Sequence, residues 1–128
     1  MGENLYYILM ADVIGSREMD GITLMNELKS LIKKVSADYK GVFLSPITIT
    51  LGDEFQSVIK SLSEAIEVII CIEETKLLLN TKITLRYVLY YGEIETEINE
   101  KIAHEMLGSG LTKSREILSN IKRGDNRI

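Results

Sequence analysis

Apolar and polar residues follow one another along the chain in an order that predicts strands and helices in turn. Residues 5–13, LYYILMADV, form a continuous apolar run that is typical of a central strand covered on both faces. Apolar positions spaced three and four apart over 22–35 predict an amphipathic helix. Alternation over 47–51 predicts a second strand and continues over 55–58 in a third. The stretch LGDEF between them therefore predicts a tight hairpin.

The second half of the chain predicts a helix, a strand and a further helix. Ser61 and Glu64 have the spacing of a capping box, and the wide apolar arc behind them predicts a deeply buried helix. A fourth strand is predicted from Thr81, and Gly92 marks a bend. Isoleucine, threonine and glutamate then alternate over 94–98, which predicts an exposed edge ribbon.

The last predicted helix carries Leu111, Ser114 and Leu118 on one stripe, with Gly124 as its C-cap. The whole order predicts an α+β fold, a ferredoxin-like βαββαβ palm with an antiparallel sheet, helices on one face and a C-terminal helix. If the third strand runs back between the first two, Asp12 at the end of the first strand meets Asp53 in the hairpin turn.

Two carboxylates at one sheet edge repel each other unless a cation or a proton intervenes. We therefore expect Asp12 and Asp53 to hold Mg²⁺ or Mn²⁺, with Glu54 either a third ligand or turned away. Backbone amides near the GSR stretch would hold phosphates. The predicted nucleotide-binding residues are Val13, Ile14, Gly15, Ser16, Arg17 and Gly52. The alternative is that Gly-Asp is only a turn and that an aspartate at a strand end is ordinary loop chemistry.

Length, charge and composition indicate the number of domains, the kinds of partner and the cellular location to expect. The 128 residues correspond to one domain, 1–128, and the formal charge of −4 argues against direct nucleic-acid binding by this domain. The basic residues Lys122, Arg123 and Arg127 are interpreted as a solvated helix end. No apolar stretch approaches the roughly 18 residues of a membrane span, and no secretory leader is evident, so a cytoplasmic protein is expected.

Four stretches, ADVIGSR, ITLGDEFQ, RYVLYYGEI and GSGLTKSREIL, resemble in order and spacing the motifs of the SatD family. They resemble more distantly the class III nucleotidyl cyclase catalytic domain, a palm-type fold. That resemblance implies that Asp12 and Asp53 are metal ligands, that Gly15 and Ser16 cradle phosphates, and that Glu54 assists the metal. In the third motif it implies structural roles for the matching residues, Arg86, Leu89, Gly92 and Ile94. It also implies a site completed across a homodimer.

The fourth motif departs from the cyclase pattern. Thr112 stands where cyclases have asparagine, Glu116 stands where they have arginine, and Arg115 comes one place early. Thr112 and Arg115 are therefore the candidate catalytic residues. SatD-like chains usually continue into a helix-turn-helix segment and cyclase domains into further strands, so this chain is expected to be either shortened or a minimal member.

Three functions stay open at this point. The first is a metal-dependent nucleotide-sensing or regulatory domain with degenerate cyclase chemistry, which the fourth motif favours. The second is an active Mg²⁺-dependent nucleotidyl cyclase or nucleotidyltransferase acting on a nucleoside triphosphate, in which a ribose hydroxyl attacks the α-phosphate. The third is a structural or interaction domain without an enzymatic role.

Overall fold

The first apolar run forms β1 (Leu5–Val13), an inner strand of a four-stranded sheet in the computed structural model, which describes residues 4–125. Its neighbours are β3 (Glu54–Ile59) and β4 (Leu85–Glu93), and β2 (Phe43–Leu51) pairs with the outer edge of β3. Every pairing is antiparallel. This order and the antiparallel sheet confirm the predicted fold class.

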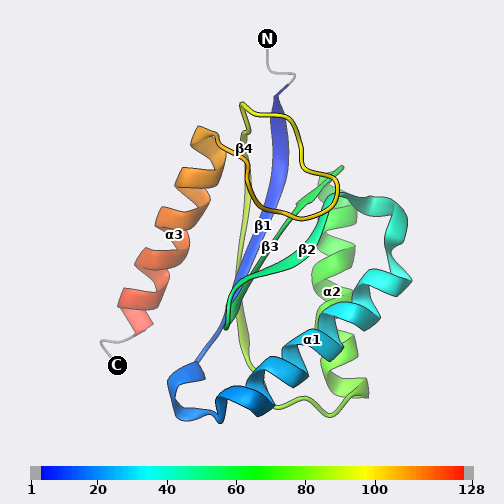
Figure 1. The fold of residues 1–128 in the computed structure, drawn as a ribbon, viewed down its shortest axis with the longest axis vertical. Helices are drawn as coiled ribbons and strands as arrows, with labels where there is room; N and C mark the ends of the chain where they lie inside the picture. Colours follow the sequence, from blue (N-terminus) through cyan, green and yellow to red (C-terminus); the bar gives the residue numbers. More distant parts are fainter. Residues whose placement is uncertain (1–3, 126–128) are drawn as a thin grey trace.

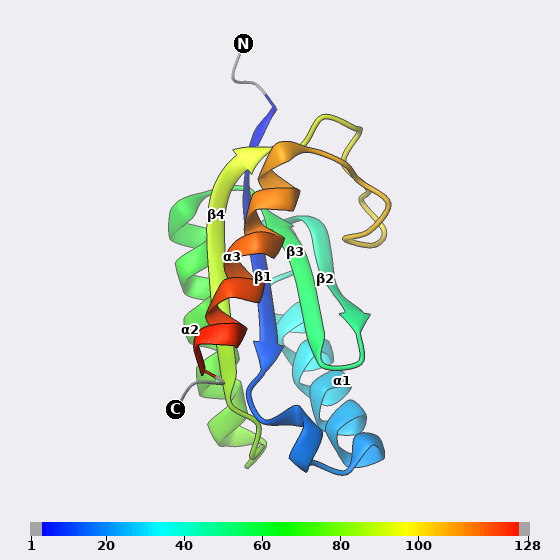
Figure 2. The same ribbon diagram turned by 90° about the vertical axis from the view of Figure 1, so that its left-hand side faces the viewer.

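Helices cover both faces of the sheet (Figure 1). On one face lie α1 (Gly21–Asp38) and α2 (Leu62–Leu78), and on the other lies α3 (Ser109–Asp125) (Figure 2). Short 3-10 turns lie on either side of α1, η1 (Ser16–Glu18) before it and η2 (Lys40–Val42) after it. No helix in the described part of the chain is long and apolar enough to cross a membrane.

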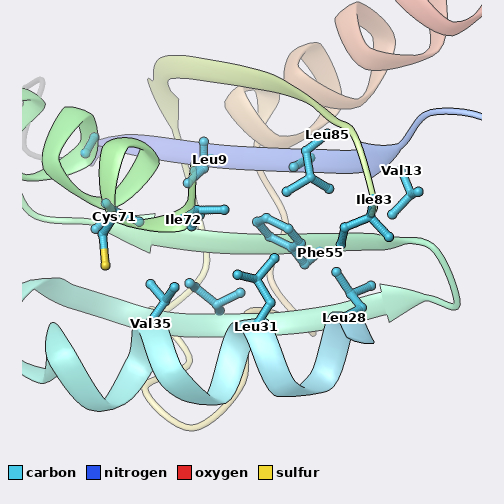
Figure 3. Packing of buried hydrophobic residues seen from close by; sticks show 14 of the residues in the cluster. Leu9, Val13, Leu28, Leu31, Val35, Phe55, Cys71, Ile72, Ile83 and Leu85 are labelled. Atoms are coloured by element: carbon cyan, nitrogen blue, oxygen red, sulfur yellow. The ribbon is translucent and has the colours of Figure 1, made fainter. Parts of the chain in front are cut away.

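Strand alternation divides the buried residues into two cores. Odd-numbered residues of β1, such as Leu9, pack against α1 and α2 together with Phe55 and Leu31 (Figure 3). Even-numbered residues, such as Met10, face α3 and pack against Leu118. Because side chains on a strand point to alternate faces, Asp12 shares the α3 face with Met10. The sheet therefore delivers this aspartate to the same layer as α3.

The capping box is confirmed at the start of α2. The Ser61 hydroxyl accepts a hydrogen bond from the Glu64 backbone N–H at 3.2 Å and donates one to the Glu64 side chain at 2.9 Å. A polar side chain at this position satisfies one of the backbone donors that the first turn of a helix leaves without a partner. The boundary between β3 and α2 is thus set by local sequence.

The predicted edge ribbon is wrong. Residues 94–108 form an irregular segment, in which the backbone N–H groups of Glu95 and Thr96 both donate to the Leu107 carbonyl. Ile94 is buried in the α3-side core, so the isoleucines of this stretch alternate because they cover a core and not because they pair with a strand. Gly124 lies inside α3 and does not cap it.

Two glycines allow α3 to begin directly on the backbone of β4. A Cβ atom on Gly92 would lie 2.7 Å from the Cα atom of Gly110, and one on Gly110 would lie 2.6 Å from the Glu93 backbone nitrogen. Real Cβ atoms do not approach backbone so closely, so both positions require glycine. Within α3, the Ser114 hydroxyl donates to the Gly110 carbonyl one turn earlier at 2.7 Å.

Candidate functional site

The end of β1 meets the turn between β2 and β3, as predicted. The Val13 backbone N–H donates to the Asp53 carbonyl at 2.9 Å, which ties the Gly52–Asp53 turn to the strand end. Antiparallel pairing places Asp12 opposite Glu54 on β3. Residues far apart in sequence are therefore brought to one sheet edge by strand order.

The segment after β1 turns back over this edge. Gly15 adopts a left-handed backbone conformation with φ of 71°, which glycine adopts without strain, and η1 follows it. The Ser16 hydroxyl then donates a hydrogen bond to Asp53 Oδ2 at 2.7 Å. This bond fixes the predicted phosphate-binding turn against the predicted metal ligand.

A small cavity of about 300 Å³, called here the edge cavity, opens at this junction. Of the predicted binding residues, its lining includes Asp12, Val13, Gly15, Ser16, Arg17 and Asp53. Ile14 and Gly52 lie outside the lining. Arg86 and Lys122 also contribute to the wall and bring two cations that the sequence did not assign to the site.

Asp12 is completely buried and is held by Arg86. Arg86 lies opposite Asp12 in the β1–β4 register, and its Nε and Nη2 atoms donate to Asp12 Oδ1 and Oδ2 at 2.7 and 3.1 Å. This two-pronged geometry is the strong form of a carboxylate–guanidinium pair. Arg86, expected only to be structural, is thus a direct partner of the first candidate metal ligand.

Glu54 is held by two cations from α3. Arg115 Nη1 donates to Glu54 Oε1, and Lys122 Nζ donates to Glu54 Oε2 at 2.9 Å. Burial by itself would raise the pKa of Glu54, but the hydrogen bonds from these two cations outweigh it, so the pKa lies below its ordinary value. Lys122 Nζ also lies 3.6 Å from Asp12 Oδ2 and joins the two acids.

These contacts form one ion cluster, made of Asp12, Glu54, Arg86, Arg115 and Lys122. The prediction that Lys122 belongs to a solvated helix end is therefore wrong, because its side chain reaches the acids on the sheet. Arg123 lines a neighbouring groove, and Arg127 lies outside the described residues. A signal was present in the sequence: Arg115 and Lys122 are seven positions apart, which places them on one helix face.

Of the three acids predicted to hold a metal ion, Asp12 and Asp53 line the edge cavity and Glu54 does not. Asp12 and Asp53 line the same cavity, and Mg²⁺ commonly takes one or two carboxylates together with phosphate and water oxygens. Over residues 4–125 no group of three histidine, cysteine, aspartate or glutamate side chains is placed to hold a metal ion. Glu54 turns toward α3 instead, so it does not join such a set.

A larger groove of about 820 Å³ lies beside the ion cluster, between α3 and the irregular segment. Met10 and Gln56 contribute to its lining from the sheet, and Thr112 and Arg115 contribute from α3. The Thr112 hydroxyl donates to the Gly108 carbonyl at 3.4 Å. Both candidate catalytic residues therefore lie along the groove, but only Arg115 reaches the ion cluster.

The fold is similar to that in the crystal structure of the guanylyl cyclase Cya2, with a TM-score of 0.61 and 14% sequence identity. The match covers 91% of this chain and 70% of that one, and at this identity the likeness shows the fold alone. No curated protein matches the chain. The sequence matches the SatD family over residues 6–126, nearly its whole length, and the chain therefore belongs to the SatD family.

Proposed function

We propose that this chain is a nucleotide-sensing domain that binds the phosphates of a nucleoside triphosphate, together with Mg²⁺ or Mn²⁺, in the edge cavity. One observation carries the proposal: the cavity combines Asp12 and Asp53 with the Gly15–Ser16 turn and with basic side chains. Carboxylates suit a divalent ion, whereas hydroxyl and basic groups suit phosphate oxygens.

The chain's own residues supply most of the proposed phosphate contacts. Arg17 and Lys122 line the edge cavity and carry the positive charge that phosphate oxygens require. Ser16 holds Asp53 in place through its hydroxyl. A divalent ion held by Asp12 and Asp53 would supply further positive charge to the same phosphates.

The groove beside the ion cluster is large enough to hold the rest of the nucleotide. Its volume of about 820 Å³ lies within the range that small-molecule sites occupy. Met10 and Leu111 give it apolar surface, and Arg115 connects it to the acids at the sheet edge. We propose that the base and sugar lie along this groove.

The arrangement on α3 favours sensing over turnover. Thr112 and Glu116 are exposed where a cyclase would have asparagine and arginine, and Lys113 is paired with Glu116 at 3.8 Å. Arg115 is already engaged by Glu54. A transition state with extra negative charge on phosphate would therefore find no uncommitted arginine at the position that the resemblance expects.

An active nucleotidyl cyclase is the second candidate, and the fold similarity to the guanylyl cyclase Cya2 is the observation that favours it. Because cyclase sites of this kind are completed across a homodimer, this candidate requires a dimer. Sedimentation with Mg²⁺ and GTP tests that requirement. Release of pyrophosphate, resolved by chromatography after incubation with each triphosphate, would establish turnover.

Calorimetry with ATP and GTP, each in the presence of Mg²⁺, tests the proposed function. We expect binding by the wild-type chain and at least a tenfold weaker affinity in Asp53→Asn. Asp38→Asn is the matched control, because Asp38 is an exposed acid on α1 that pairs with Lys34. No binding by the wild type, or equal binding by Asp53→Asn, would refute the proposal.

A further inference from the structure

The ammonium group of Lys122 lies between two buried carboxylates that come from different strands. It is 2.9 Å from Glu54 Oε2 and 3.6 Å from Asp12 Oδ2. The Asp12 side chain is 0% exposed and the Glu54 side chain 4%, whereas that of Lys122 is 35% exposed. One ammonium group from α3 therefore bridges two acids that water hardly reaches.

Charge balance explains why a shared cation is needed. Arg86 neutralises Asp12 and Arg115 neutralises Glu54, each across a direct contact. The two acids still repel each other, because they are opposite neighbours on β1 and β3. A positive charge shared between them reduces that repulsion, which is what a divalent ion does between two carboxylates.

We infer that Lys122 is an internal substitute for a divalent cation. It supplies positive charge between Asp12 and Glu54 while the edge cavity holds no metal–nucleotide complex, and a metal ion that binds Asp12 must displace it from that acid. Metal alone therefore binds weakly, because it must compete for Asp12 with an ammonium group that Glu54 holds beside it at 2.9 Å.

A phosphate group changes this balance. Lys122 and Asp12 both line the edge cavity, so an ammonium group that leaves Asp12 meets a phosphate oxygen in the same space. This second step rests on the proposed function. It makes metal and nucleotide bind cooperatively, since the phosphate offsets the positive charge of Lys122 that otherwise competes with the metal for Asp12.

Binding of Mn²⁺ alone, followed by electron paramagnetic resonance, tests the first step without any nucleotide. We expect Lys122→Gln to bind Mn²⁺ at least tenfold more tightly than the wild type, and Lys122→Gln with Asp53→Asn to lose that gain. Lys113→Gln is the matched control, because it removes the same charge from the same helix at an exposed site paired with Glu116. Equal Mn²⁺ affinity in Lys122→Gln and the wild type would overturn the inference.

Metal-dependent folding provides a second measurement. If Lys122→Gln is unfolded in chelator, Mn²⁺ must restore its helical circular dichroism, and failure to do so overturns the inference. The second step is tested by calorimetry of the wild type, in which Mg²⁺ must tighten ATP or GTP binding at least tenfold. If the wild type binds no nucleotide but Lys122→Gln gains Mn²⁺ affinity, the proposed function fails while the internal cation stands.

Discussion

Replacing Arg86 with glutamine should destabilise the fold more than most surface changes do. The substitution removes both donors that Arg86 places on Asp12, at 2.7 and 3.1 Å. Asp12 is fully buried, so it cannot recover these contacts from water. Among the described residues, Lys122 also forms an ion pair with Asp12, with its Nζ 3.6 Å from Asp12 Oδ2.

The size of the effect follows from these contacts. Breaking a buried ion pair by removing one partner costs about 3–5 kcal/mol, because a charge is left buried without compensation. Lys122 offsets part of this loss, so the lower end applies and we expect a cost of about 3 kcal/mol. For a domain of this size that corresponds to a fall in Tm of roughly 10 °C.

Urea unfolding followed by circular dichroism measures this cost. In a double-mutant cycle, Arg86→Gln combined with Asp12→Asn should be less destabilised than the sum of the single changes, with a coupling energy of about 2 kcal/mol. Lys34→Gln is the control, because Lys34 forms only an exposed pair with Asp38 at 3.9 Å, which is worth about 0.5 kcal/mol or less. A cost for Arg86→Gln no larger than that of the control, or an additive cycle, would refute the reasoning.

Further predictions concern α3, Glu54 and the cap of α2. Gly110→Ala should destabilise the protein by about 1–3 kcal/mol, because its Cβ atom would overlap the β4 backbone. Gly124→Ala should instead stabilise it by up to about 1 kcal/mol, because a Cβ atom there meets open space and alanine favours a helix more than glycine does. Thermal melts of the two variants test both expectations. Burial raises the pKa of Glu54, but the hydrogen bonds from Arg115 and Lys122 lower it by more, so its folded pKa lies below the ordinary 4.5. Its contribution to stability is therefore fully present above about pH 5.5 and lost as the pH falls through the lowered folded pKa, and Glu54→Gln should flatten that part of a urea-midpoint profile against pH. Ser61→Ala should cost about 1 kcal/mol in urea unfolding, and an unchanged midpoint would contradict the capping role.

Much of the fold was predictable because local patterns agree with tertiary structure. The apolar run of β1, the helical stripe of α1 and the Ser61 cap each depend on neighbours in sequence, and all are found where they were predicted. The juxtaposition of Asp12 and the Asp53 turn followed from strand order alone. The binding roles of these two residues stay predictions.

The parts that were not predicted depend on contacts between distant segments. Apolar and polar residues alternate over 94–98 as they would in a strand, but here the pattern arises because Ile94 is buried in the α3-side core. Arg86 and Lys122 meet Asp12 only once the strand register and the placement of α3 are known. The sequence pattern shows which acidic residues lie at turns, but it does not show which long basic side chains will pair with them.

The close contact between Gly92 and Gly110 has a mechanical consequence for α3. Backbone meets backbone at this end of the helix, whereas long side chains hold the other end, so any tilt of α3 would be centred on the glycine contact. Lys122 lies twelve residues beyond Gly110, or about 18 Å along the helix axis at 1.5 Å per residue. A rotation of about 5° at the glycine contact would carry that end roughly 1.5 Å, enough to stretch a hydrogen bond of ordinary length past its limit. A tilt that small would thus be enough to exchange the partner of Lys122.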